Sequence, residues 1–330
     1  MAVSLPLHGG DLLGAELRWG RPDHGWLDLS TGINPWPYPL PDIPAAAWHR
    51  LPGAAEERAL RHAAASAWSV PDSGMVVAAP GSQPLIQAIP RLLGKGRRVA
   101  VLGPTYGEHA RAWSAAGHDV RIVAAPDDVG DAEVAVAVNP NNPDGRIIVP
   151  ERLEQLAELL SRRGGLLVVD EAFADTCPTL SLAGRPRPGL VVLRSFGKFH
   201  GLAGLRLGFA VAQPEVTEHL ADMLGPWAVS GPALEVGRRA LADRAWAEAT
   251  RTRLAAASAA LAEVLRQGGL QVVGGTSLFQ LARHADAAAL YDRLGQAGIL
   301  ARAFADRSDL LRFGLPDGVG SLARLKRALA

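Results

Sequence analysis

The sequence predicts an α/β protein: a large domain built on a mostly parallel sheet, followed by a smaller α+β domain. Short apolar runs alternate with helical patterns from about residue 75 to residue 209, which is typical of a parallel sheet covered by helices on both faces. An alanine-rich helical stretch over residues 232–267 then leads out of this alternation. With 330 residues, 48% of them hydrophobic, the chain can bury a large core.

The individual elements follow from the periodicity of the apolar residues. Helical spacing recurs over residues 85–93 and 150–162, and the tail 270–330 is expected to form a strand, a helix, a strand and a helix. Seven apolar runs have the length of strands: residues 76–79, 98–102, 119–123, 134–138, 166–169, 191–193 and 207–211. We therefore expect an N-terminal arm, a large domain and a small domain, at residues 1–34, 35–235 and 236–330.

Composition narrows the class of protein. The net charge of +1 gives no electrostatic case for binding nucleic acid or an anionic membrane. The single cysteine, Cys177, excludes an intrachain disulfide and offers no metal cluster; a small apolar role suits it better than a nucleophilic one. No run is apolar enough to span a bilayer, and residues 1–6 lack the features of a signal peptide. We expect a cytoplasmic enzyme without a metal.

One lysine, Lys198, stands among small residues in the segment RSFGKFHGLAGLRLGF, residues 194–209. Ser195 precedes it by three positions and Arg206 follows it by eight. Glycines permit close backbone approach, and a hydroxyl and a guanidinium can both bind phosphate. Pyridoxal phosphate (PLP) needs this combination: an amine for a Schiff base and a bound phosphate. A solvated lysine in a glycine-rich loop fits the segment equally well.

Two predicted strand ends favour the cofactor. The run 168–173 (VVDEAF) ends a buried strand in Asp170, and ligands of open α/β sheets collect at the carboxyl ends of strands. An anion there favours a protonated pyridine ring, which is the better electron sink. The turn 139–145 (NPNNPDG) follows another strand, and an asparagine in it can reach the phenolic oxygen of PLP. Either segment alone is weak evidence; together and in this order they indicate PLP.

With these motifs the chain resembles the fold-type I PLP enzymes, in the branch that holds histidinol-phosphate aminotransferases and threonine-phosphate decarboxylases. The resemblance extends from His8 to Arg312 and implies a homodimer. It implies Lys198 as the Schiff-base lysine, Asp170 as the partner of the pyridinium nitrogen, and Tyr106 as the ring-stacking aromatic, the three catalytic residues. The remaining cofactor contacts that it implies are Asn142 at the ring oxygen, Ser195 and Arg206 at the phosphate, and Gly81, Ser82 and Gln83 at a phosphate-binding helix start.

The resemblance also implies a substrate, a phosphorylated amino acid. Arg312, in LLRFG, falls on the arginine that binds the α-carboxylate, a bidentate match of planar groups. Two segments near the N-terminus, 8–11 (HGGD) and 27–35 (LDLSTGINP), resemble the corresponding segments of the threonine-phosphate decarboxylases of cobalamin synthesis. Histidinol-phosphate aminotransferases usually lack the HGG element. The substrate residues implied or considered are His8, Gly32, Asn34, Asn142 and Arg302. Arg146 is a weaker candidate, with surface charge as the simpler explanation, and a solvated terminus is the simple explanation for His8.

Three positions depart from the family pattern. Leu51 stands where the branch often has a tyrosine that reaches the neighbouring subunit's cofactor phosphate. Phe173 stands where many aminotransferases have a tyrosine at the ring oxygen. His200, two residues after the lysine, is more simply explained by packing than by catalysis. These departures suit an enzyme that does not need full transaminase chemistry.

Three functions remain open at this point. The first is a PLP lyase that makes (R)-1-aminopropan-2-yl phosphate from threonine phosphate. The second is an aminotransferase of the histidinol-phosphate type. The third, a non-catalytic relative, would have no reason to keep Lys198, Asp170, Asn142 and Arg206 together. Lyase and transferase differ in which bond at Cα is held perpendicular to the ring, and sequence does not reveal that geometry.

Overall fold

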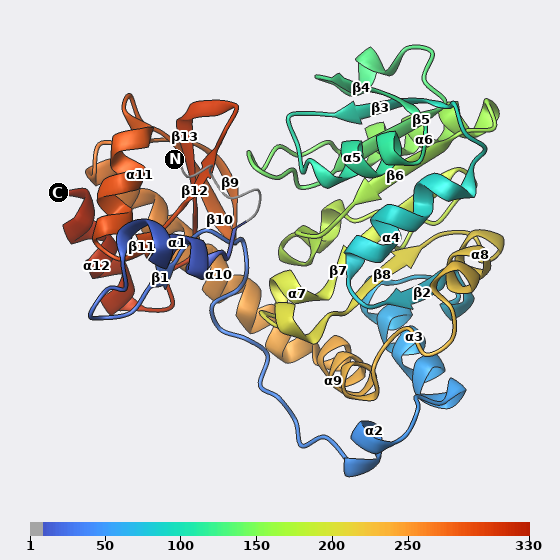
Figure 1. Ribbon diagram of the computed structural model, residues 1–330. Coiled ribbons are helices and arrows are strands. Elements are labelled where there is room, and N and C mark those ends of the chain that lie inside the picture. Colours follow the sequence, from blue (N-terminus) through green and yellow to red (C-terminus); the bar gives the residue numbers. More distant parts are fainter. Residues whose placement is uncertain (1–8) are drawn as a thin grey trace. The chain divides into compact units, whose positions relative to one another are not determined.

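The computed structural model describes residues 9–330, which divide into two compact units (Figure 1). The sheet unit comprises Pro37–Asn142 and Arg146–Ala247. The terminal unit comprises residues 9–36, Pro143–Gly145 and Glu248–Ala330. Among the described helices, none combines the length and apolar character needed to cross a membrane.

A seven-stranded sheet forms the centre of the sheet unit, in the order β2-β8-β7-β6-β5-β3-β4. Neighbouring strands are parallel except β8, which pairs antiparallel with both β2 and β7. The strands are β2 Val76–Ala79, β3 Arg98–Leu102, β4 Asp119–Val123, β5 Val134–Val138, β6 Leu166–Asp170, β7 Leu190–Ser195 and β8 Gly208–Val211. The predicted α/β fold with a mostly parallel sheet is confirmed.

Helices cover both faces of this sheet because its strands are apolar on both sides. Val169 packs into the core of one face and its neighbour Val168 into the core of the other, as the two-residue period of a strand requires. One face is covered by α3 Ala54–Trp68, α6 Pro150–Arg162 and α9 Gly231–Ala242, and the other by α4 Ser82–Ala88, α5 Glu108–Ala115 and α8 Pro214–Leu224. Two short helices complete the unit, α2 Ala45–His49 and α7 Phe196–Phe199.

Two predicted helices differ in detail. The helix expected at 85–93 is α-helical only to Ala88 and continues as a 3₁₀ turn, Ile89–Leu92, because Pro90 has no N–H to donate. The stretch 232–267 is two helices, α9 and α10 Arg244–Gln267. The break falls at Asp243, whose carboxylate accepts the backbone N–H of Trp246 at 2.9 Å and so begins the second helix.

The terminal unit is built on a four-stranded antiparallel sheet in the order β12-β13-β10-β9. Its strands are β9 Gln271–Thr276, β10 Phe279–Arg283, β12 Arg302–Phe304 and β13 Arg307–Gly314. A second, two-stranded sheet pairs β1 Leu27–Asp28 with β11 Ile299–Leu300, and the helices, besides α10, are α1 Leu12–Trp19, α11 Ala287–Gln296 and α12 Val319–Leu329. The expectation of a single strand on either side of α11 was wrong. Two hairpins occur there, and their two-residue turns, 277–278 and 305–306, carry no Asn-Gly signal.

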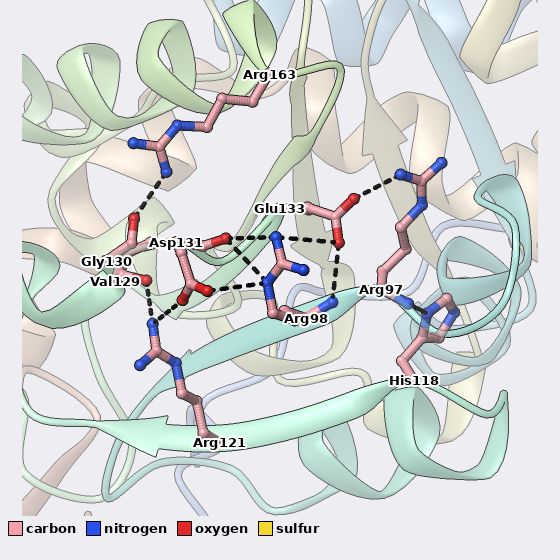
Figure 2. A network of polar contacts seen from close by, with 9 residues as sticks. All are labelled: Arg97, Arg98, His118, Arg121, Val129, Gly130, Asp131, Glu133 and Arg163. Atoms are coloured by element: carbon pink, nitrogen blue, oxygen red, sulfur yellow. Dashed lines mark hydrogen bonds and ion pairs between the residues drawn. The ribbon is translucent and has the colours of Figure 1, made fainter.

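A polar network joins the beginnings of neighbouring strands in the sheet unit (Figure 2). Arg97 donates to Glu133 at 2.6 Å, and Arg98 donates to the carbonyl oxygen of Asp131 at 3.1 and 3.2 Å. Arg121, on β4, donates to the carbonyl oxygen of Val129. Arg97, Arg98 and Glu133 lie where β3 and β5 start and Arg121 lies in the middle of β4, so the network joins these three strands on the side of the sheet where β3 and β5 begin.

Candidate active site

A cavity of about 180 Å³ lies in the sheet unit where β5, β6 and β7 end. Val138, Asp170 and Ser195, the last residues of these three strands, line it. Parallel strands place their carboxyl ends at one edge of a sheet, where ligands bind. The structure brings every predicted cofactor-binding residue to this one cavity: Gly81, Ser82, Gln83, Tyr106, Asn142, Asp170, Ser195, Lys198 and Arg206.

Asp170 is buried and its orientation is fixed from two sides. Its Oδ1 accepts the backbone N–H of Ala172 at 3.0 Å, and its Oδ2 lies 2.8 Å from Nε2 of His109. His109 is 1% exposed and packs edge-to-face against Tyr106, with ring centroids 6.2 Å apart. Since an ionised carboxylate only accepts, the imidazole carries its proton on Nε2. The carboxylate retains acceptor capacity towards the cavity.

Sequence analysis missed His109. The sequence signal that could have found it is its position three residues after Tyr106. His109 is the second residue of α5, which begins at Glu108. On a helical turn this spacing places the two side chains on one side. Its partner is 61 residues away in sequence, so the pair became visible only when β6 and the start of α5 were placed.

Other residues that line the cavity supply hydrogen-bond donors. Arg206 adopts a left-handed backbone conformation (φ 55°), and its guanidinium lies against Gly81. A Cβ at Gly81 would come within 2.6 Å of Nη2, and a Cβ at Gly208 would come within 2.4 Å of the Ser82 nitrogen. The two glycines thus let β8, Arg206 and the start of α4 approach closely. Ser82 and Ser195 add hydroxyls on the same cavity, a donor set that suits a phosphate.

Lys198 lies on α7, the short helix that directly follows β7. Its Nζ is 6.0 Å from the centroid of the Phe173 ring, and both residues line the cavity. Gly197 is required beside it, because a Cβ there would come within 2.7 Å of the Ala203 Cα.

His200 does not line the cavity. Its buried ring stacks on Phe196, with centroids 4.1 Å apart, and on Trp246 at 5.5 Å. This aromatic stack accounts for His200 by packing, as the sequence analysis favoured.

Tyr106 carries a neutral hydroxyl over the physiological range. Burial, followed by the charges of Glu108 and Asp170, raises the pKa of Tyr106 to about 12. The hydroxyl lies 3.5 Å from Oε1 of Gln83, whose amide nitrogen donates to Glu108 at 3.1 Å. Tyr106 thus offers the cavity an uncharged aromatic face and a protonated oxygen.

The loop that carries Asn142 is tied to the loop that carries Tyr106. Asn141, which is buried, accepts the Thr105 hydroxyl at 2.6 Å and donates to the carbonyl oxygen of Pro104 at 2.9 Å. These contacts join the segments that follow β5 and β3, which are neighbours in the sheet. Tyr106 and Asn142 are therefore held in a fixed relation across two strand ends.

The predicted carboxylate ligand, Arg312, belongs to the terminal unit. It is 7% exposed, on β13, and its Nη2 donates to the carbonyl oxygen of Ser30 at 2.8 Å. Arg302, on β12, lies directly across from it in the strand register. Burial, and then the charge of Arg302, lower the pKa of Arg312 to about 10, while Asp28 acts in the opposite direction. Burial also lowers the pKa of Arg302.

The remaining candidates are placed as follows. Asn34 and Gly32 are buried in the terminal unit, and Asn34 accepts the backbone N–H of Trp36 at 2.9 Å. Arg146 donates to the carbonyl oxygens of Ala124 at 3.1 Å and Gly103 at 3.4 Å, in two neighbouring loops. These contacts give Arg146 a structural role that needs no substrate. Leu51 is exposed on the sheet unit, and His8 lies outside the described residues.

Comparisons with known proteins agree with this geometry. The chain matches the family model "Aminotransferase class I and II" over residues 47–316. It is 47% identical to a threonine-phosphate decarboxylase of Pseudomonas aeruginosa, over 98% of this chain and 96% of that one. It is 46% identical to a threonine-phosphate decarboxylase of Sinorhizobium sp, over 99% of both.

The fold is similar to that of solved structures as well. A histidinol-phosphate aminotransferase from Sinorhizobium meliloti, solved in complex with pyridoxal-5'-phosphate, superposes with a TM-score of 0.84 at 23% identity, over 99% of this chain and 94% of that one. The chain belongs to the aminotransferase class I and II family and, within it, to the threonine-phosphate decarboxylases.

Proposed function

We propose that the protein is a PLP-dependent carboxy-lyase of cobalamin synthesis that converts L-threonine O-3-phosphate to (R)-1-aminopropan-2-yl phosphate and CO₂. The observation that carries the proposal is identity of nearly one half, over nearly the whole chain, to relatives that bear the name threonine-phosphate decarboxylase. The cavity supports it, because it holds an amine, a buried carboxylate and a cluster of phosphate-binding donors.

The cavity residues fit PLP by their chemistry. When bound, PLP supplies an electron sink for bond cleavage at the Cα of an amino acid. Lys198 would hold its aldehyde carbon, Asp170 its ring nitrogen, and Arg206 with Ser82 and Ser195 its phosphate. The close approach that Gly81 permits to Arg206 is an observation of this chain that such a phosphate site requires.

Each side chain then has a definite task. Asp170, held by His109 and the Ala172 amide, would favour the protonated form of the pyridine nitrogen. His109 is a positioning residue, since it acts on the cofactor only through Asp170. Lys198, once released from the cofactor and protonated, would donate the proton that replaces the departing CO₂ at Cα of the substrate. Phe173 offers no hydroxyl to the ring oxygen, which leaves Asn142 for that contact.

The substrate carries two anionic groups, and the terminal unit offers two neighbouring cations. Arg312 binds the α-carboxylate, and Arg302, opposite to it in the strand register, binds the phosphate. The buried guanidinium of Arg312 and the half-buried guanidinium of Arg302 repel each other in the free protein, and a ligand with two anionic groups relieves that repulsion. His8, Gly32 and Asn34 complete the proposed substrate contacts.

The proposal includes a cytoplasmic homodimer with an isologous interface, as the family resemblance implies. Sedimentation of the purified protein tests the assembly. A monomer with full activity would contradict it.

One assay decides between the lyase and the aminotransferase. Purified protein loaded with PLP is given threonine phosphate, and release of CO₂ is followed with and without 2-oxoglutarate. Release of CO₂ without a 2-oxo acid supports the lyase. Turnover that requires 2-oxoglutarate would make the protein an aminotransferase.

A further inference from the structure

Ser30 joins the N-terminal Gly9–Gly10 turn to Arg312 inside the terminal unit. Ser30 is buried and follows β1 in the chain. Its hydroxyl oxygen accepts the Gly10 N–H at 2.7 Å and donates to Asp28 at 2.5 Å. Its carbonyl oxygen accepts Nη2 of Arg312 at 2.8 Å, although the two residues are 282 positions apart. One residue therefore connects two distant elements, with its side chain on one side and its main chain on the other.

Gly9 packs against the same carbonyl group. A Cβ at position 9 would lie 2.3 Å from the Ser30 carbonyl oxygen and 2.9 Å from its carbon. These are backbone atoms, which cannot swing aside as the end of a side chain can. A side chain at residue 9 must therefore displace the turn, the carbonyl that orients Arg312, or both.

The segment around Ser30 is anchored on its other side. The Gly314 N–H, two residues after Arg312, donates to the carbonyl oxygen of Leu29 at 2.6 Å. Asp28 also accepts the backbone N–H of Ser30 at 2.8 Å. Because the Leu29 carbonyl and the Ser30 N–H, which directly precede the Ser30 carbonyl, are both hydrogen-bonded, we expect a displacement by Gly9 to reach Arg312.

We propose that Ser30 is a positioning residue that couples the Gly9–Gly10 turn to Arg312, so that the backbone beside His8 and the substrate-carboxylate arginine are held as one unit. The inference rests on the proposed function, because it assigns Arg312 to the substrate. It predicts that a substitution of Gly9, which has no functional group of its own, weakens substrate binding through Arg312.

Kinetics of two variants test the coupling. Gly9→Ala and Ser30→Ala are each expected to raise KM for threonine phosphate about tenfold, because a misaligned charge-assisted hydrogen bond binds more weakly. The kcat is expected to fall as well, because the carboxylate that Arg312 holds is the group that leaves, so its orientation affects the bond that breaks. Gly320→Ala, in α12, is the matched control, because within residues 9–330 its added Cβ meets no atom within 4 Å apart from its chain neighbours and the backbone of its own helix. An unchanged KM in Gly9→Ala would overturn the proposal.

A double-mutant cycle separates coupling from independent damage. If Gly9 acts through the orientation of Arg312, Gly9→Ala adds little to the KM of Arg312→Lys. Fully additive effects of the two changes would contradict the coupling.

Hydrogen–deuterium exchange provides a readout that needs no substrate. Peptides that contain Gly10 should exchange faster in Ser30→Ala and in Arg312→Lys than in wild type and in Gly320→Ala. Unchanged exchange in both variants would overturn the proposal. If wild type fails to decarboxylate threonine phosphate, the proposed function fails, while the exchange experiment still decides whether Ser30 couples the two elements.

Discussion

Arg302 lies directly opposite Arg312 in the antiparallel pair of β12 and β13. Like charges opposite each other on neighbouring strands destabilise a sheet. The proximity shows in the pKa of Arg312, which the charge of Arg302 lowers beyond the effect of burial. Such a pair costs stability in the free protein and is useful when a ligand with two anionic groups is present.

We therefore expect Arg302→Met to be at least as stable as wild type while using threonine phosphate less well. Methionine keeps a long apolar side chain and removes the repulsion of Arg312. Urea denaturation measures the first effect, and KM, expected to rise at least about tenfold, measures the second. Arg146→Met, outside the proposed substrate contacts, is the control for KM. A less stable variant with an unchanged KM would remove Arg302 from the substrate site.

The lowered pKa of Arg312 predicts the pH dependence of stability. The unfolded chain binds this proton up to the ordinary, higher pKa of an arginine, whereas the folded chain releases it from about pH 10. The unfolded state therefore binds more protons between these values, and stability rises with pH in that window. We compare the free energy of unfolding of wild type with that of Arg312→Met. The difference should shift in favour of wild type between about pH 9.5 and 11, a range that brackets the pKa of Arg312 in the folded protein. A constant difference would show that Arg312 is not desolvated.

Lys198→Ala should abolish the covalent link to the cofactor and the activity while the fold remains. The chain has only three lysines, Lys95, Lys198 and Lys326, so the assignment can be tested completely. Borohydride reduction of the PLP-loaded protein followed by peptide mapping should label Lys198 alone. Lys95→Ala serves as the control and should be labelled like wild type. A label on another lysine would overturn the assignment.

Asp170→Ala should bind PLP through Lys198 and the phosphate contacts but lose turnover by a factor on the order of 10² or more, because a neutral pyridine is a poorer electron sink. His109→Ala should lose less, since it leaves the carboxylate in place without its second contact. The double variant should be no worse than Asp170→Ala, because His109 acts only through Asp170. Near-wild-type turnover of Asp170→Ala, or additive losses, would contradict these roles.

His8→Ala is expected to raise KM for threonine phosphate by about 10- to 100-fold, the effect of losing a charge-assisted hydrogen bond worth roughly 1.5–3 kcal/mol. The absorbance band of the bound cofactor should not change. His24→Ala, a second histidine of the N-terminal region, is the control. Unchanged kinetics in His8→Ala would mean that the HGG element only forms a turn.

The sequence alone determined the sheet and the residues at its carboxyl edge. Continuous apolar runs mark strands that are buried on both faces, and the polar residues that follow them, Asp170 and Asn142, must then meet at one edge. Lys198 and Arg206 could be assigned because they lie within one short segment with Ser195. The nine residues predicted for the cofactor accordingly line one cavity.

Contacts between distant segments were decided only by the tertiary structure. The neighbours of Asp170 and Arg312, which are His109 and Ser30, depend on which elements pack together and in which register. The pairing of Arg302 with Arg312 required the β12–β13 hairpin, whose turn carries no sequence signal. Periodicity reports which face of an element is buried and not which partner buries it, so these relationships could not be predicted from sequence.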